Sequence, residues 1–375
     1  MATFEVRVVR IQGIDEHTNA DALELARVHG YRSVIRRGDF AEGDLAVYIP
    51  EGAVVPREIL VTLGLWDWDK DAGRLAGREG NRVKAIRLRG EISQGLLMKP
   101  LEGMAEGDDV AADLGITKWE PPIPPAMNGE VVSIGPGLFP GYDIENLQRH
   151  PDVLQIGEPV RVTEKIHGTL TGMVHDPAAD SDRLTASNRA GCWMSFSKGL
   201  GAKGLVFADA EQNHRNIYLR SMKTALDQGL DEKIVEMRDA GFCDLAADEP
   251  VTIFGETFGE GVQDLKYGQK GIAFRVFDVY FGRSGVGRWL NDLQLRQFAD
   301  WAGFDLVPVL YSGTFYEGMV EELRDGKSTF DSKQIREGIV ITPHEERWDS
   351  ALGRVIVKAV SPDYLLRKGN TTEFN

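Results

Sequence analysis

The chain has 375 residues, a length that suits two domains better than one, and its composition is that of an ordinary globular protein. It contains no run of about 18 apolar residues that could span a bilayer. Its first residues lack the features of a signal peptide, so we expect a cytoplasmic protein without a membrane segment. The two cysteines, Cys192 and Cys243, indicate neither a zinc site nor a disulfide framework. The formal net charge of −15 argues against indiscriminate nucleic-acid binding but leaves room for a local basic groove.

Short apolar segments separated by glycine turns fill residues 1–120. Many short strands in so few residues predict a small β-barrel, and we expect one of the OB type that binds nucleic acid. Between positions 82 and 89 cations alternate with apolar residues, with one slip that fits a β-bulge. We interpret this segment as a strand face that follows a phosphate backbone; the alternative is a solvated edge strand protected by its charge. The cations are Arg82, Lys84, Arg87 and Arg89.

The proline-rich stretch after Trp119 cannot continue a sheet ladder and marks the best domain boundary. We interpret residues 121–150 as a Pro/Gly-rich linker that wraps onto the second domain, and 151–375 as that domain. There the pattern predicts buried strands at 251–254, 272–279, 338–341 and 355–360, and helices over 216–226 and 290–301 that stop at Gly229 and Gly303. The predicted fold class is therefore α+β, a small barrel followed by a domain of antiparallel sheets and helices.

The stretch from Val162 to Thr169 (VTEKIHGT) is the central candidate for a functional site, because an apolar-flanked strand there ends at Lys165 in a glycine turn. A lysine there acts either as an ammonium that binds phosphate or as a neutral amine that acts as a nucleophile. The alternative is a surface lysine beside an ordinary turn.

Four further segments follow Lys165 in a fixed order, namely FGETFG (254–259), FRVFDV (274–279), EGIVI (337–341) and VIVKAV (355–360). Together with Lys165 they resemble the motif set of covalent nucleotidyltransferases: DNA ligases, RNA ligases and mRNA capping enzymes. The form Glu-Lys-Ile-His-Gly is similar to RNA ligase 2. The extra domain precedes the motifs and little sequence follows Lys358, which resembles the Deinococcus-type ATP-dependent RNA ligases. The resemblance implies an ATP-grasp-like ligase domain at 151–375.

The resemblance also implies roles for individual residues. Lys165 attacks the α-phosphorus of ATP and becomes a lysyl-adenylate. A free lysine has a pKa near 10.4, so the site must supply roughly 3–4 kcal/mol to favour the neutral amine. Lys358, on the α-phosphate, and a divalent metal ion positioned by Glu337 are the available positive charges.

The nucleotide is held by further residues in this resemblance. Glu164 accepts from the adenine amino edge, and Glu256 binds the ribose hydroxyls. Phe277 stacks on the purine, with Phe274 as the alternative ring. Taken alone, these phenylalanines are more often core residues, and Glu256 and Glu337 could be ordinary turn carboxylates.

Three more residues complete the expected nucleotide contacts. His167 and Gly168 belong to the Lys165 turn, although His167 alone would suit a structural histidine. Arg189 is a candidate for binding the substrate 5′-phosphate or the leaving pyrophosphate.

The sequence departs from the superfamily pattern in two places. Its last motif has one lysine instead of two, for which Arg354 or Lys368 could compensate. His167 stands where most members have Asp, so a carboxylate is missing, and metal handling rests on Glu337, with Asp278 as a further candidate.

We therefore predict an ATP-dependent polynucleotide ligase that seals 3′-OH/5′-phosphate nicks in a duplex whose 3′-OH strand is RNA, with Mg²⁺ or Mn²⁺ as the metal. No obligate protein partner is evident. One alternative is a GTP-using capping-type transferase, which Glu164 and the domain order disfavour. The other is a non-catalytic OB-type RNA-binding protein.

Overall fold

A computed structural model describes residues 4–120 and 123–367, which form two compact units. The smaller unit contains residues 4–120, 145–153 and 360–367, and the larger contains 123–144 and 154–359. Of the expected linker at 121–150, residues 123–144 belong to the larger unit, in line with a segment that wraps onto the second domain, whereas 145–150 belong to the smaller unit. Leu138 and Phe139 are buried in a core of the larger unit, where the Phe139 ring stacks on Phe196 at a centroid distance of 3.9 Å. Burial of these apolar side chains stabilises the segment in the larger unit, although its proline and glycine content alone is typical of a linker.

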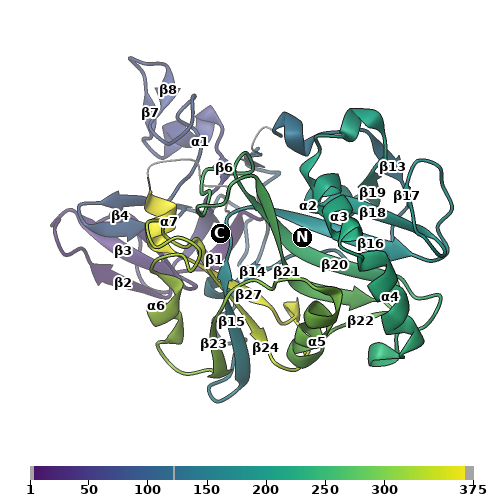
Figure 1. Cartoon of the computed structure of the whole chain (residues 1–375). Coiled ribbons are helices and arrows are strands. Elements are labelled where there is room, and N and C mark those ends of the chain that lie inside the picture. The colour runs from purple at the N-terminus through teal and green to yellow at the C-terminus, as the bar shows by residue number, and fades with distance from the viewer. Residues whose placement is uncertain (1–3, 121–122, 368–375) are drawn as a thin grey trace. The chain divides into compact units, whose positions relative to one another are not determined.

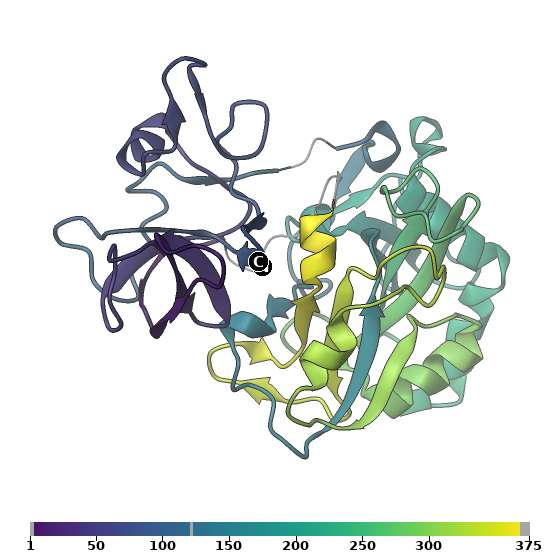
Figure 2. The same ribbon diagram turned by 90° about the vertical axis from the view of Figure 1, so that its left-hand side faces the viewer.

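Two three-stranded antiparallel sheets, in the orders β1-β5-β11 and β2-β3-β4, organise the smaller unit (Figure 1). Their alternating apolar residues are buried in two clusters around Val47 and Tyr31. A lobe made of α1, β7 and β8 projects from these sheets in both views (Figures 1 and 2). The strands of this unit are β1 (Arg7–Arg10), β2 (Gly13–Glu16), β3 (Leu23–Val28), β4 (Tyr31–Arg36), β5 (Leu45–Ile49), β6 (Ala53–Val54), β7 (Trp66–Asp67), β8 (Ala72–Gly73), β9 (Ile86–Leu88), β10 (Glu91–Ser93), β11 (Leu96–Met98), β12 (Thr117–Lys118) and β14 (Glu145–Asn146). Its helices are α1 (Arg57–Thr62), η2 (Leu147–Arg149) and α7 (Pro362–Leu366).

The prediction of one continuous strand from Arg82 to Arg89 is wrong. Only Ile86–Leu88 forms a strand, β9, which pairs with β10 through a turn at Arg89 and Gly90. Arg82 sits in isolated bridges to Val54 and Ala76 instead. The four cations therefore do not share one strand face.

Two large antiparallel sheets, together with the two-stranded pairs β13–β19 and β25–β26, make up the strands of the larger unit. One contains β27, β24, β15 and β23 side by side, and the other has the order β17-β18-β16-β20-β21-β22. The buried strands predicted from the sequence are confirmed as β20, β21, β24 and β27. The strands of this unit are β13 (Val131–Ser133), β15 (Pro159–Lys165), β16 (Thr169–Asp176), β17 (Thr185–Ala186), β18 (Cys192–Ser197), β19 (Leu205–Phe207), β20 (Val251–Gly259), β21 (Ile272–Phe281), β22 (Arg288–Trp289), β23 (Val309–Thr314), β24 (Gly338–Pro343), β25 (Trp348–Asp349), β26 (Gly353–Arg354) and β27 (Val357–Val360).

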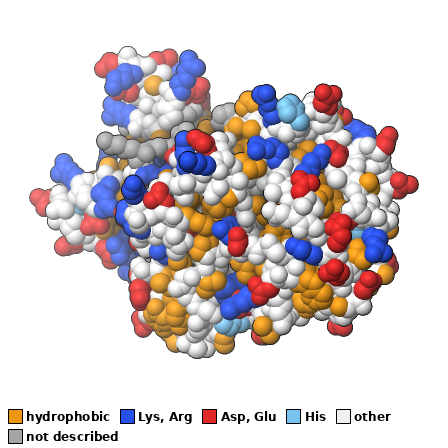
Figure 3. Space-filling view, viewed as in Figure 1, with side chains coloured by type: hydrophobic (Ala, Val, Ile, Leu, Met, Phe, Trp, Pro, Cys, Tyr) orange, Lys and Arg blue, Asp and Glu red, His pale blue; other side chains and the backbone are white. Residues whose placement is uncertain are grey.

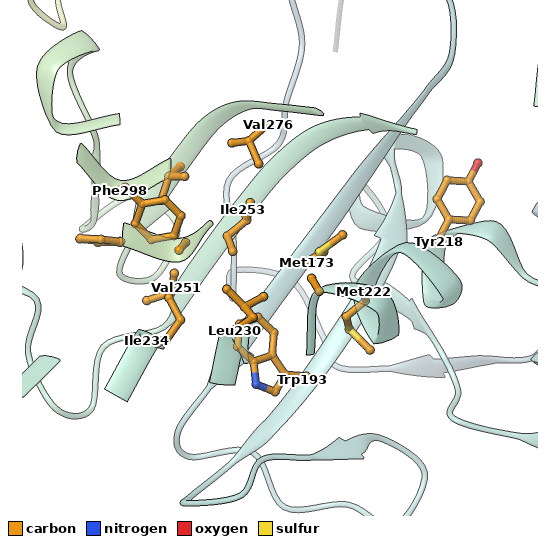
Figure 4. Packing of buried hydrophobic residues seen from close by; sticks show 14 of the residues in the cluster. Met173, Trp193, Tyr218, Met222, Leu230, Ile234, Val251, Ile253, Val276 and Phe298 are labelled. Atoms are coloured by element: carbon orange, nitrogen blue, oxygen red, sulfur yellow. The ribbon is translucent and has the colours of Figure 1, made fainter. Parts of the chain in front are cut away.

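Helices α3 and α5 pack on the six-stranded sheet, and α4 contacts both of them. Their apolar faces meet the sheet in a core that contains Met173, Trp193, Ile253 and Phe298 (Figure 4). Both predicted helices are confirmed: α3 begins after the N-cap Asn216, and α5 ends at Gly303, whose φ of 75° suits a glycine cap. The helices of this unit are η1 (Pro125–Met127), α2 (Lys198–Gly201), η3 (Glu211–Asn213), α3 (Ile217–Asp227), α4 (Leu230–Asp239), η4 (Phe242–Asp244), α5 (Asp292–Ala302) and α6 (Met319–Arg324).

The α+β class predicted from the sequence is confirmed by these elements. No helix in the described residues is long and apolar enough to cross a membrane.

Candidate active site

The Lys165 turn lies where the chain passes from one sheet of the larger unit to the other. β15 ends at Lys165, and β16 begins at Thr169 in the six-stranded sheet. Gly168 lets the turn approach β20: a Cβ at this position would lie 2.4 Å from the Thr257 carbonyl oxygen and 2.9 Å from Glu256 Cγ. Only glycine fits there without displacement, so the turn brings Lys165 and Glu256 into one neighbourhood.

Lys165 and Glu337 form an ion pair at this junction. Lys165 is opposite Gly338 in the β15–β24 ladder, so the residue just before β24 reaches the lysine. Lys165 Nζ lies 3.0 Å from Glu337 Oε1, and the two side chains are 16% and 1% exposed. Neither Glu337 oxygen accepts a hydrogen bond from the residues the structure describes. The carboxylate is thus buried beside the Lys165 ammonium group and retains acceptor capacity for a further positive partner.

Glu164 points into a buried environment and is held by one oxygen only. Its Oε2 accepts hydrogen bonds from the Thr329 backbone N–H (2.8 Å) and hydroxyl (2.7 Å). Its Oε1 accepts none from the described residues, although the residue is only 1% exposed. A buried acceptor without a donor is costly, so this oxygen is suited to a donor on a ligand.

His167 is buried among polar groups that fix its backbone and its ring. Its backbone N–H donates to the Tyr267 hydroxyl oxygen at 2.6 Å. Burial, followed by the charge of Glu337, raises the pKa of Tyr267 well above its ordinary value, so this hydroxyl keeps its proton. His167 Nε2 lies 2.7 Å from Asp264 Oδ1, and Nδ1 lies 3.6 Å from Glu337 Oε2. Asp264 therefore supplies a carboxylate close to the position where the sequence lacked one.

Glu256 and Phe277 come from the second sheet. Glu256 is on β20 and is paired with Leu170 of β16, which follows Gly168 by two residues. The β20–β21 ladder shifts register between Phe254 and Gly255, which leaves Phe277 as the extra residue of a bulge. Phe277 packs against the cluster that contains Ile166, the residue after Lys165.

The alternative ring, Phe274, lies elsewhere. It covers Gly255, where an added Cβ would be 2.3 Å from its ring, and it meets Phe304 edge to face. Its cluster is the helical core of the larger unit rather than the cluster around Ile166. This placement favours Phe277 as the ring nearer the Lys165 turn.

Lys358 is on β27, separated from β15 by β24, and is 9% exposed.

Arg354 was considered as a substitute for the second motif lysine, and Asp278 as a further carboxylate for the metal, but these two residues are hydrogen-bonded to each other. Arg354 donates to Asp278 Oδ2 at 2.5 Å and to both oxygens of Glu346 at 2.6 Å. Its guanidinium also lies 3.9 Å from the Trp289 ring centroid. The structure thus gives Arg354 and Asp278 a buried structural role, and Lys368 lies outside the described residues.

The structure does not bring Arg189 to this site. It lies in the tip between β17 and β18, and β18 begins at Cys192 opposite Asp176, the last residue of β16. The Lys165 turn is at the other end of β16, roughly 23 Å away at about 3.3 Å per residue. The tip is fixed in place because Asp231 accepts hydrogen bonds from the Ser187 hydroxyl and the Asn188 backbone N–H.

The four cations of the smaller unit differ in exposure. Arg82 is 7% exposed, and its guanidinium lies 3.3 Å from the Trp119 ring centroid. Burial, followed by the charge of Arg82, lowers the pKa of Lys84. Arg87 and Arg89 are exposed. Only the latter two remain as surface cations of the kind that the sequence predicted.

Three residues at this site were missed by sequence reasoning: Thr329, Tyr267 and Asp264. No local pattern marks Thr329, which is 165 residues from its partner Glu164 in the chain. Within the described residues there is no cluster of three or more His, Cys, Asp or Glu side chains that could hold a metal ion.

Comparisons with known proteins agree with this architecture. A family model described as "RNA ligase" matches residues 158–360, and an OB-fold domain model matches residues 5–101. The predicted OB-like barrel and C-terminal ligase domain are thereby confirmed. The comparison with curated proteins found no match.

Solved structures of a Naegleria gruberi RNA ligase have the same fold. A mutant with ATP and Mn has a TM-score of 0.73 at 22% identity, over 96% of this chain and 98% of that one. A second mutant, with AMP and Mn, has a TM-score of 0.75 at 22% identity, over 97% and 98% of the two chains. The complex with PPi has a TM-score of 0.71 at 23% identity, again over 97% and 98%. Because the family model covers more than half of the sequence, including the Lys165 turn, Glu337 and Lys358, the chain belongs to the RNA ligase family.

Proposed function

We propose that this RNA ligase uses ATP to form a Lys165–AMP intermediate and then seals a 3′-OH/5′-phosphate nick in a duplex. The observation that carries the proposal is the Lys165–Glu337 pair at the junction of the two sheets, with Glu164 as the preceding residue of the same strand. It combines a partly exposed amine, a buried carboxylate with unused acceptor capacity, and a second buried carboxylate oxygen suited to a ligand donor. The Naegleria structures with ATP, AMP and PPi support the same substrate chemistry.

Lys165 performs the first step. Its neutral amine attacks the α-phosphorus, a phosphoramidate bond forms, and pyrophosphate leaves. Glu337 stabilises the ammonium form when no nucleotide is bound, so the carboxylate must be drawn toward another cation before the amine can react. The AMP group then passes to the 5′-phosphate, and the 3′-OH attacks that phosphate and releases AMP.

Other side chains hold the nucleotide during these steps. Glu164 Oε1 accepts from the adenine amino group, Glu256 binds the ribose hydroxyls, and Phe277 stacks on the purine. Lys358 stabilises the charge that develops on the α-phosphate. His167 and Gly168 hold the turn in place, and Arg189 is left out of this set because it lies at the far end of β16.

The chemistry of Glu337 fits a divalent metal ion. Hard cations such as Mg²⁺ and Mn²⁺ are commonly bound by one or two carboxylates together with substrate phosphates, which suits a single buried carboxylate whose oxygens accept no hydrogen bond from described residues. When bound, the metal offsets phosphate charge. Asp264, which contacts His167, fixes the imidazole next to Glu337.

The nucleic-acid partner follows from the family and the OB-type unit. We expect a nicked duplex with RNA on the 3′-OH side, where a contact to the 2′-OH distinguishes RNA from DNA. On the face shown in Figure 3, basic and acidic side chains are intermingled, in keeping with the overall acidic charge. Of the four cations predicted from the sequence, Arg87 and Arg89 are the two that can meet phosphates, because both are exposed.

Incubation with ATP or GTP labelled at the α-phosphate, followed by denaturing electrophoresis, tests the proposal. We expect label from ATP only, and none in Lys165→Ala. Label from GTP instead would indicate a capping-type transferase, and absence of label from both would leave a binding protein. Sealing assays on matched all-RNA, all-DNA and mixed nicks then test the substrate: equal sealing of all-DNA nicks would contradict the requirement for an RNA 3′-OH.

A further inference from the structure

We propose that Thr329 is a positioning residue that sets the preference of this site for adenine. The inference rests on the proposed adenylylation function and adds a specificity determinant to it. Thr329 does not need to touch the nucleotide. It acts by fixing the orientation of Glu164, whose other oxygen would meet the base.

Thr329 holds Glu164 through two donors on one residue. The backbone N–H at 2.8 Å and the hydroxyl at 2.7 Å both reach Oε2, so the carboxylate cannot rotate without losing both hydrogen bonds. Hydrogen bonds to a charged carboxylate are stronger than those between neutral groups. As a result Oε1, buried and without a donor from the described residues, keeps a fixed direction and remains an acceptor.

The segment that carries Thr329 is itself tied to the Lys165 turn. Phe330 packs against Phe258 and Tyr267, at centroid distances of 5.1 and 5.7 Å. Gln334 Oε1 accepts from the Tyr267 backbone N–H at 3.1 Å, and the Tyr267 hydroxyl accepts from the His167 backbone N–H. Thr329 is thus placed by the same aromatic cluster that places the nucleophile's neighbours, and Ser328, whose hydroxyl accepts from the Phe330 N–H at 3.1 Å, closes the local turn.

A fixed acceptor distinguishes purines by the group at carbon 6. Adenine presents an amino donor there, whereas guanine and hypoxanthine present a carbonyl, which would face Oε1 as a second acceptor. A purine with hydrogen at this carbon presents neither and leaves the buried oxygen without a partner. A carboxylate free to rotate would lose part of this discrimination because Oε1 could turn away from the carbonyl.

Substitution of Thr329 by Val keeps the shape and the backbone N–H but removes the hydroxyl donor. The methyl group cannot remain 2.7 Å from Oε2, because van der Waals contact between carbon and oxygen requires a larger separation, so the carboxylate must move. Thr329→Ser retains the hydroxyl and should retain the orientation. Ser328→Ala loosens the same turn without touching Glu164 and serves as a matched control.

The experiment measures Lys165–AMP formation with ATP and adduct formation with purine riboside triphosphate, which lacks the 6-amino group, and compares kcat/KM for the two in each variant. We expect the wild type to prefer ATP by about tenfold or more, the size of one hydrogen bond to a charged group. In Thr329→Val that preference should fall to about twofold, through a loss confined to ATP, whereas Thr329→Ser and Ser328→Ala should keep the wild-type ratio.

Three results would overturn the proposal: an unchanged ratio in Thr329→Val, an equal loss for both nucleotides, or the same fall in ratio in Ser328→Ala. Both kcat/KM values of a ratio are measured on the same variant, so a fraction of unfolded protein lowers both values equally and leaves their ratio unchanged. Failure of the proposed function looks different, since the wild type would then form no adduct with ATP.

Discussion

Lys165 Nζ lies 3.0 Å from Glu337 Oε1 because Lys165 is opposite Gly338 in the β15–β24 ladder. The other Glu337 oxygen is 3.6 Å from His167 Nδ1. One buried carboxylate therefore faces both the proposed nucleophile and the histidine that replaces the usual aspartate. The proposed attack by the lysine amine therefore requires this ion pair to be broken.

Glu337→Gln should slow Lys165–AMP formation and raise the Mn²⁺ concentration needed for it, by roughly 10–100-fold, because the amide lacks the negative charge that holds a divalent cation. Single-turnover adduct formation measured over a series of Mn²⁺ concentrations checks this. The exposed Glu345, changed to Gln, is the matched control. An identical metal requirement in Glu337→Gln and the wild type would remove Glu337 from the metal site.

Gly168→Ala should destabilise the larger unit by about 1–3 kcal/mol, because the new Cβ would collide with the Thr257 carbonyl and Glu256 Cγ. Adduct formation should fall as the turn moves away from β20. Gly199→Ala is the control, since no atom lies within 4 Å of its Cβ position. Denaturant unfolding of both variants gives the comparison, and equal stabilities would show that the turn accommodates a side chain.

His175 should make stability depend on pH. Burial, followed by the charge of Arg238, outweighs the hydrogen bond to the Ala190 carbonyl and lowers the pKa of His175 in the folded state. Below the unfolded value of about 6.5 the unfolded chain binds a proton that the folded chain does not, so stability falls as pH drops from that value through the depressed one. The free energy of unfolding should decrease more between pH 7.5 and 5.5 in the wild type than in His175→Gln. Parallel pH curves would contradict this assignment.

Arg82 and the exposed pair Arg87 and Arg89 should behave differently when changed to Ala. Arg82→Ala should destabilise the smaller unit by about 1–2 kcal/mol, because it removes a buried guanidinium stacked on Trp119. The Arg87/Arg89 double variant should remain stable but bind nicked duplex more weakly, with a salt dependence lower by roughly one unit for each lost phosphate contact. Binding titrations at several salt concentrations and thermal unfolding separate the two effects. Wild-type binding by the double variant would exclude this surface.

The sequence predicted those parts of the fold that local patterns encode. The helix over Ile217–Asp227 and the strand over Val251–Gly259 follow from apolar periodicity and capping residues. The alternation of cations and apolar residues wrongly predicted a continuous strand that includes Arg82. The chain there forms isolated bridges, and the Arg82 side chain stacks on Trp119, which is distant in the sequence. The composition of residues 121–150 predicted a linker that wraps onto the second domain, but it did not reveal that aromatic and aliphatic side chains of residues 131–144 join a core of the larger unit.

In the candidate site, too, residues marked by local sequence motifs could be predicted, whereas residues placed by distant contacts could not. Lys165, Glu164 and Glu337 could be placed from motifs because each stands at the end of a strand with a recognisable flank. Thr329 and Asp264 could not, because their roles arise only from contacts across long chain separations. Arg189 has a suggestive local sequence, yet the β16–β18 register carries it to the opposite end of the strand.

The most direct test of the account is the mass of the intact protein under denaturing conditions after incubation with ATP and Mn²⁺, followed by peptide mapping. The account predicts a gain of one AMP, located on Lys165, that is absent in Lys165→Arg and removed by adding a nicked duplex with an RNA 3′-OH. No gain of mass, or AMP attached at Lys358 or any other residue, would contradict it.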